Sequence, residues 1–257
     1  MRIDPKKSLG QNFLINRGVV EKIIRAADLK KDDTVLEIGP GTGILTEKLV
    51  SQVDRLIAVE KDSRLIAPLS EKFPQVEVIE DNILSFKIEN LKLKIGGYKV
   101  IGNIPYYLTS RLFRIIFETW PQPQLMLFMV QKEVARRIMA TPPHMNLLAL
   151  SVQFFSTPEI IADVSRGSFR PMPNVDSAVV KITPKKINSD KSAQKALFAL
   201  MRAGFSSKRK QLAGNLAAHL SINKAAVQET LKNLGISEDI RAENLSLQDW
   251  IILQKAV

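Results

Sequence analysis

The sequence predicts a Rossmann-like α/β domain followed by a small all-helical domain. Between residues 34 and 184, short apolar runs typical of buried strands alternate with runs of helical periodicity, the order of a parallel sheet covered by helices. A polar, charged stretch, PKKINSDKSAQ, follows, and the apolar residues after it recur at helical spacing. We therefore expect one domain at residues 1–187 and a second at 188–257.

The individual elements follow from these patterns. We expect parallel strands at residues 34–39, 55–60, 76–80, 98–103 and 124–130, with helices at 44–53, 63–73, 110–120 and 131–140. The run VDSAVVKIT at 175–183 predicts one more strand, and a final strand of this kind commonly lies antiparallel at or near the sheet edge. The helices expected in the second domain cover 195–205, 208–220, 224–235 and 246–257.

The composition excludes several kinds of site. The chain has no cysteine and two histidines, His144 and His219. Disulfides, cysteine-ligated zinc and thiol nucleophiles are thus excluded, histidine chemistry has little room, and we expect no metal. The first residues lack a signal-peptide pattern and no run of 18 apolar residues occurs, so we expect a soluble cytoplasmic protein without membrane contact.

Positive charge is concentrated at the two ends of the chain. The net charge is +11, and residues 1–31 and 181–257 carry the excess, whereas residues 32–180 are almost neutral. The densest basic cluster, Lys208, Arg209 and Lys210, stands at the head of a predicted helix. For these three residues alone, a solvated helix end is an equal alternative. Together with the charge of the whole chain, the cluster predicts binding to RNA or DNA phosphates.

A glycine-rich turn follows the first expected strand. In VLEIGPGTG, the glycines Gly39, Gly41 and Gly43 predict a tight turn into a helix that brings backbone N–H groups against a ligand. The spacing is G-x-G-x-G and departs from the dinucleotide pattern G-x-G-x-x-G. A turn in which glycine only permits a positive φ is the structural alternative.

Polar side chains end the next two expected strands. Glu60 stands about 20 residues beyond the glycine turn, where a carboxylate can accept hydrogen bonds from both hydroxyls of a ribose. Asp81 and Asn82 end the following strand, where a carboxylate can accept from an adenine amino group. Because the carboxyl ends of parallel strands meet at one crevice, these residues predict a nucleotide-like ligand such as a nicotinamide cofactor or S-adenosyl-L-methionine.

The fourth expected strand decides between these ligands, because it runs into Asn103-Ile104-Pro105-Tyr106. This motif resembles the (Asp/Asn/Ser)-x-Pro-(aromatic) signature of S-adenosyl-L-methionine-dependent amino methyltransferases, which implies a class I methyltransferase fold. In that signature the Asn and a backbone carbonyl accept the two N–H groups of an aromatic amine, while the Tyr ring stacks on the flipped base. Transfer from a sulfonium depends on positioning and electrostatics more than on a strong base.

From Ser8 to the C-terminus the chain resembles the KsgA-type ribosomal RNA adenine dimethyltransferases. The resemblance rests on Leu9-Gly10-Gln11-Asn12-Phe13-Leu14, on Phe169-Arg170-Pro171-Met172-Pro173-Asn174-Val175-Asp176-Ser177, and on the segment from Phe205 to Leu212. It implies that the first segment folds over the cofactor and that Phe169 and Tyr106 sandwich the target adenine. The resemblance implies these cofactor-binding residues: Asn12, Leu14, Gly39, Glu60, Asp81 and Asn103, with Glu37, Gly41, Lys61 and Asn82 nearby.

The implied function is dimethylation of N6 of two adjacent adenines near the 3′ end of small-subunit rRNA, by a monomer acting on a pre-ribosomal particle during ribosome biogenesis. Three alternatives stay open. The first is a large-subunit rRNA adenine methyltransferase of the macrolide-resistance type, which has nearly the same core motifs. The second is a non-catalytic assembly factor on the same fold, which the intact Glu60, Asp81 and Asn103 motifs disfavour. The third is a dehydrogenase, which the glycine spacing disfavours.

Overall fold

The computed structural model describes residues 4–6, 9–187 and 189–256, except for the side chain of Tyr106. The chain forms two compact units. The first comprises Met1–Ala135 with Ser156–Pro184, and the second comprises Arg136–Phe155 with Lys185–Val257. Each unit has its own hydrophobic core.

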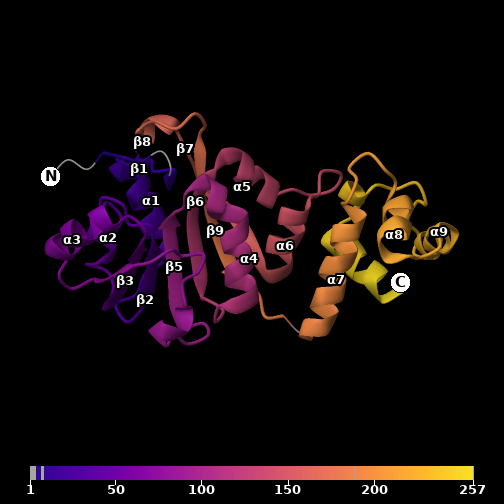
Figure 1. Cartoon of the computed structure of the whole chain (residues 1–257), viewed down its shortest axis with the longest axis horizontal. Helices are drawn as coiled ribbons and strands as arrows, with labels where there is room; N and C mark the ends of the chain where they lie inside the picture. The colour runs from indigo at the N-terminus through magenta and orange to yellow at the C-terminus, as the bar shows by residue number, and fades with distance from the viewer. Residues whose placement is uncertain (1–3, 7–8, 188, 257) are drawn as a thin grey trace. The chain divides into compact units, whose positions relative to one another are not determined.

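A seven-stranded sheet forms the centre of the first unit (Figure 1), with the order β4-β3-β2-β5-β6-β9-β7. The strands are β2 (Thr34–Ile38), β3 (Arg55–Glu60), β4 (Glu77–Glu80), β5 (Tyr98–Asn103), β6 (Leu125–Gln131), β7 (Ser156–Val164) and β9 (Ser177–Pro184). The run from β4 to β6 is parallel, and β9 pairs antiparallel with both β6 and β7. The predicted α/β fold and its antiparallel last strand are confirmed.

The edge strand β7 was not predicted from the sequence. Its residues, STPEIIADV, contain a proline and two acids, and most of them are exposed or only partly buried. A strand at the edge of a sheet packs on fewer neighbours, so its sequence lacks the continuous apolar run of a central strand. As a result β9 lies one position inside the edge.

Helices cover both faces of this sheet, as β6 shows. Leu127 of β6 belongs to the core cluster that includes α1 (Arg17–Ala27). The next residue, Phe128, instead meets Phe113 of α4 (Thr109–Thr119) with ring centroids 5.5 Å apart. Because successive side chains point to opposite faces of a strand, the sheet is buried on both sides. The other helices of this unit are α2 (Thr46–Leu49), α3 (Ser63–Lys72) and the start of α5 (Lys132–Ile138).

A second, two-stranded sheet and three 3-10 turns complete the first unit. The two-residue strand β1 (Phe13–Leu14) pairs antiparallel with β8 (Phe169–Arg170). Single 3-10 turns are formed at Ile88–Leu91, Tyr106–Leu108 and Arg166–Ser168. The segment before α1 is thereby attached to a part of the chain more than 150 residues away.

The regular secondary structure in the described residues of the second unit is all helical. It contains α6 (Leu147–Phe155), α7 (Lys191–Gly204), α8 (Leu212–Leu220), α9 (Lys224–Asn233), a 3-10 turn at Ala242–Asn244 and α10 (Leu247–Ala256). The break at residue 184 lies close to the expected boundary at 187, but Arg136–Phe155 also belongs to this unit. Its apolar residues explain why: Ala149 and Leu150 of α6 are fully buried in the cluster around Trp250 of α10.

Two expected helices are shorter in the structure. The helix expected at 44–53 contains only α2, which follows a run of turns. Lys208, Arg209 and Lys210 lie in the loop before α8 and not on the helix itself. Among the described helices none is long and apolar enough to cross a membrane, and the described residues contain no cluster of metal-ligating side chains.

Candidate active site

One open cavity lies at the carboxyl edge of the sheet, with about 980 Å³ of empty volume. Strand register places it there, because Ile38 at the end of β2 pairs with Val59 of β3 and Gly102 of β5. The cavity is lined by residues of the N-terminal segment 9–14, the glycine turn, and the ends of β3, β4 and β5. The crevice outside the carboxyl ends of parallel strands is where α/β sheets bind ligands.

Glycine is required where backbone segments approach closely at this edge. A Cβ on Gly102 would lie 2.7 Å from the carbonyl oxygen of Ile38, so only glycine lets β5 reach the turn after β2. Gly41 has a φ of 59°, in the left-handed region that glycine enters without strain. This conformation aims the Gly41 N–H at the carboxylate of Glu60, 3.2 Å away.

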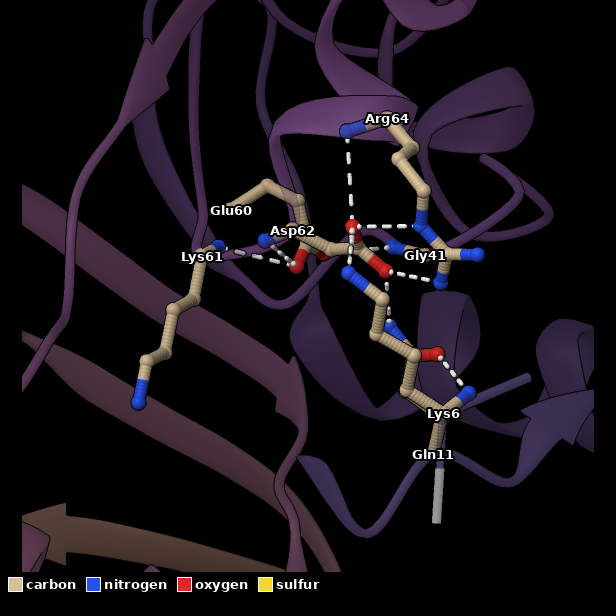
Figure 2. A network of polar contacts seen from close by, with 7 residues as sticks. All are labelled: Lys6, Gln11, Gly41, Glu60, Lys61, Asp62 and Arg64. Atoms are coloured by element: carbon tan, nitrogen blue, oxygen red, sulfur yellow. Dashed lines mark hydrogen bonds and ion pairs between the residues drawn. The ribbon is translucent and has the colours of Figure 1, made fainter. Parts of the chain in front are cut away.

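Glu60 is a buried carboxylate held by three backbone donors. Its Oε1 accepts from the N–H groups of Lys61 (2.8 Å) and Asp62 (2.9 Å), and its Oε2 accepts from Gly41. Burial raises the pKa of Glu60, and the three N–H groups oppose that rise by stabilising the ionised form. Figure 2 shows these contacts, with the Lys61 side chain pointing away from them. A carboxylate so placed on the cavity wall suits two ribose hydroxyl donors.

Asn103, at the end of β5, carries an oriented amide. Its Nδ2 donates to the carbonyl oxygen of Asn12, 3.0 Å away, which leaves Oδ1 as an acceptor. Ile104 is buried beneath it, and both Ile104 and Pro105 line the cavity. The predicted stacking role of Tyr106 falls on a side chain outside the described residues.

The other end of the crevice is formed by Asp81 and Asn82, both half-buried on the cavity wall. The Asp81 N–H donates to the carbonyl oxygen of Glu60 (3.0 Å), which fixes the two strand ends together. The Asn82 N–H donates to Asp81 Oδ1 at 2.6 Å. The structure thus brings Asn12, Leu14, Gly39, Gly41, Glu60, Lys61, Asp81, Asn82 and Asn103 to one cavity, as expected.

Among the described side chains, two residues predicted to contact the cofactor or the target base do not line that cavity. Phe169 is buried in the core cluster, and its backbone pairs with Leu14. Glu37 is buried beside the glycine turn, and its Oε2 accepts from Thr46 Oγ1 at 2.7 Å. Its other oxygen has no hydrogen-bond partner among the described residues. The base-stacking role of Phe169 and the cofactor contact of Glu37 therefore stay predictions.

Three residues at the site were missed as functional candidates. Gln11 belongs to the N-terminal segment 9–14 and hydrogen-bonds to Asp62, and the ring of Tyr107 lies against Gly10 of the same segment. Asp62 has a recognisable signal, since an Asp directly before the helix pattern SRLIAPLSEK predicts an N-cap, and its carboxylate does accept from the Arg64 N–H. Its second contact, to Gln11, joins residues 51 positions apart and has no local signal.

Burial of Glu37 predicts a pH-dependent stability. Desolvation raises the pKa of Glu37 from 4.5 to about 8. The folded state therefore binds a proton on the Glu37 carboxyl more tightly than the unfolded state does. The stability that this proton contributes is lost as the pH rises from about 4.5 to about 8. We expect Glu37→Gln to flatten this part of the pH dependence in chemical denaturation. The exposed Glu89→Gln serves as the control, and an unchanged slope in Glu37→Gln would assign the dependence to another group.

The sheet order, the acid that ends β3 and the Asn-Ile-Pro-Tyr turn after β5 define a class I methyltransferase, whose methyl donor is S-adenosyl-L-methionine. The polar groups of the cavity fit that molecule, since Glu60 can accept hydrogen bonds from its ribose hydroxyls and Asp81 can accept one from its adenine amino group. The family model for ribosomal RNA adenine dimethylase matches residues 3–257. The chain belongs to this family.

Individual relatives agree with the family match. The chain is 42% identical over 252 residues to the ribosomal RNA small subunit methyltransferase A of Dehalococcoides mccartyi, covering 96% of this chain and 87% of the relative. It is 40% identical to the protein of that name from Crocosphaera subtropica, covering 97% of both. A dimethyladenosine transferase from Plasmodium falciparum superposes with a TM-score of 0.80 at 30% identity, covering 94% of this chain and 95% of that one.

The 23S rRNA methyltransferase ErmE superposes with a TM-score of 0.77 over 95% of this chain and 99% of its own. Its sequence identity is 24%, so this likeness supports the fold and not the substrate.

Proposed function

We propose that this chain transfers methyl groups from S-adenosyl-L-methionine to N6 of two adjacent adenines near the 3′ end of small-subunit rRNA, as a monomer acting on a pre-ribosomal particle. The observation that carries the proposal is the amide of Asn103, held by Asn12 at the wall of a cavity that Glu60 also lines. The names of relatives 36–44% identical to this chain support the small-subunit substrate.

The residues act by positioning. S-adenosyl-L-methionine supplies an electrophilic methyl group on a sulfonium, and Glu60 and Asp81 orient it. Asn103 Oδ1 accepts one N–H of the target amine and the backbone carbonyl of Ile104 accepts the other. These two bonds favour a tetrahedral nitrogen whose lone pair faces the methyl group. Because a neutral amide suffices as acceptor, the site needs no strong base at Asn103.

Methyl transfer onto separate ribosomal RNAs tests the proposal. The protein and labelled S-adenosyl-L-methionine are incubated with small ribosomal subunits and, separately, with large-subunit RNA, both from cells that lack the modification. The modified nucleosides are then identified by mass spectrometry. Dimethyladenosine in the small-subunit RNA is the expected product. Label only in large-subunit RNA would place the chain with the macrolide-resistance type, and tight binding without label would indicate an assembly factor.

The second unit supplies a candidate RNA contact. Lys208, Arg209 and Lys210 are exposed in the loop before α8. Asn215 of α8 fixes this loop, because its Nδ2 donates to the carbonyl oxygens of Gly204 (2.6 Å) and Ser207 (3.0 Å). We propose that the three basic side chains bind rRNA phosphates, since an anchored loop presents them together.

Replacing Lys208, Arg209 and Lys210 with Ala should weaken RNA binding in a salt-dependent way. The slope of log K against log[salt] should become shallower by about 2, since each phosphate contact contributes roughly 0.7–0.9. Binding titrations from low to moderate salt measure this slope. The control removes the same charge from exposed, dispersed positions, Lys224, Lys232 and Lys255. Equal slopes in the two triple variants would show that net charge, and not this loop, holds the RNA.

A further inference from the structure

Residues 9–14 form a strap along one wall of the cavity, and all six of them line it. One end of the strap is fixed to the body of the first unit. Phe13 and Leu14 pair with β8, and the N–H of Ile15 donates to the carbonyl oxygen of Ser168 at 2.8 Å. The middle of the strap lacks such strand pairing. Lys6, shortly before the strap, forms an ion pair with Asp62 (Nζ to Oδ1, 3.7 Å), and two contacts are made by the strap itself.

The first contact is made by Gln11, whose side chain is held at both of its polar atoms. Its Oε1 accepts from the Lys6 N–H at 2.7 Å, and its Nε2 donates to Asp62 Oδ2 at 2.8 Å. Figure 2 shows the Asp62 carboxylate between Gln11 and the guanidinium of Arg64. We call the Gln11–Asp62 contact the latch.

Contacts other than the one to Gln11 hold the Asp62 side chain in place and keep it ionised. Its side chain has no exposed surface, and Arg64 donates to both of its oxygens, at 2.9 and 2.7 Å. The hydrogen bonds from Arg64 hold the pKa of Asp62 well below its usual range, so the acceptor is ionised at any working pH. A hydrogen bond to a fixed carboxylate is stronger than one between neutral groups.

Asp62 does not line the cavity, but it contacts a residue that does. Its backbone N–H donates to Glu60 Oε1 at 2.9 Å, the carboxylate that faces the ribose position. One residue thus connects the carboxylate at the ribose position to the strap, through its backbone on one side and its side chain on the other.

The second contact of the strap reaches the methyl-transfer side. The carbonyl oxygen of Asn12, the residue after Gln11, accepts from Asn103 Nδ2 at 3.0 Å. An amide can rotate to present either its oxygen or its nitrogen, and this bond selects the rotamer in which Oδ1 is the free acceptor. The strap therefore touches the group that receives the target amine.

We propose that Asp62 is a positioning residue for methyl transfer: through Gln11 it holds the strap in place, and the strap in turn orients the amide of Asn103. The second part of this inference, that the strap orients Asn103 for methyl transfer, rests on the proposed function. It predicts that a change at the latch affects both cofactor affinity and kcat, although Asp62 contacts neither the cofactor position nor the amine position.

Three variants test the latch. Gln11→Leu keeps the size of the side chain and removes its donor, and we expect S-adenosyl-L-homocysteine to bind about tenfold more weakly. Gln11→Glu places a second carboxylate against Asp62, so the loss should be larger. The double variant Gln11→Glu with Asp62→Asn restores one donor and one acceptor with the polarity reversed. It should recover most of the affinity and kcat that Gln11→Glu loses.

A matched control exists in the second unit, where Gln211 Nε2 donates to Asp239 Oδ1 at 2.7 Å. Gln211→Leu removes the same kind of bond far from the strap in sequence, and it should leave S-adenosyl-L-homocysteine affinity unchanged. Thermal unfolding of every variant separates the latch from a general loss of stability. Hydrogen exchange without cofactor should become faster at residues 9–14 in Gln11→Leu and unchanged in the sheet.

The outcomes separate the two halves of the proposal. Failure of the double variant to recover, in a folded protein, would overturn the latch. Weaker cofactor binding with an unchanged kcat would overturn the orientation of Asn103 by the strap. If the unchanged protein methylates no ribosomal RNA, the proposed function fails, and calorimetry together with hydrogen exchange still decides whether the latch holds the strap.

Discussion

Asn103→Ala should abolish methyl transfer while leaving the affinity for S-adenosyl-L-homocysteine within a few-fold of its original value. The substitution removes the Oδ1 acceptor for the target amine and the Nδ2 bond to the Asn12 carbonyl, but the Gln11–Asp62 contact still holds the strap and the groups around Glu60 are unchanged. Loss of a single preorganised polar group at a reacting centre commonly lowers kcat by about 10² to 10³. Single-turnover transfer onto small-subunit RNA and calorimetric titration with the product measure the two quantities separately.

Asn103→Asp distinguishes the two roles of the amide. An aspartate keeps an oxygen acceptor, but it lacks the donor that reaches the Asn12 carbonyl and places a carboxylate 3.0 Å from that oxygen instead. We therefore expect Asn103→Asp to lose transfer as well and to loosen residues 9–14. Asn90→Ala, at an exposed position of the 3-10 turn Ile88–Leu91, is the control for a harmless Asn substitution. Turnover retained in Asn103→Ala would assign the amine to another acceptor.

The central strands could be predicted because their sequences depend mainly on burial. The run LMLFMV within β6 is apolar throughout, and TVLEI of β2 is apolar except for Thr34 and the buried Glu37, as expected of strands covered on both faces. The edge strand β7 gave no such signal. The excursion Arg136–Phe155 was assigned to the first domain because sequence order alone places it there, whereas its buried residues pack with Trp250, about 100 positions later.

Site residues were predictable where topology decides their position. Glu60 and Asn103 end β3 and β5, and Asp81 directly follows β4, so the sheet brings all three to one edge whatever the loops do. Contacts between loops distant in sequence have no such rule. The Gln11–Asp62 bond depends on how the N-terminal segment crosses the cavity, and the burial of Phe169 depends on the pairing of β8 with β1.

Glu60→Ala should weaken cofactor binding by about a hundredfold or more. The carboxylate accepts hydrogen bonds from three backbone N–H groups, so its removal takes away the ribose acceptor and also leaves those donors without a partner. Glu60→Gln keeps the volume, but its amide nitrogen must face one of the N–H donors. Both variants should lose affinity, with Ala losing more, as calorimetry with S-adenosyl-L-homocysteine would measure.

The pH dependence of the same binding step tests whether the ionised form of Glu60 is the acceptor. Burial raises the pKa of Glu60, so lowering the pH through that value protonates a group that must accept from ribose hydroxyls. Affinity in the unchanged protein should therefore fall as the pH is lowered. In Glu60→Gln this part of the dependence should disappear, because an amide does not titrate. An identical pH profile in both proteins would mean that a group other than Glu60 controls the pH dependence of binding.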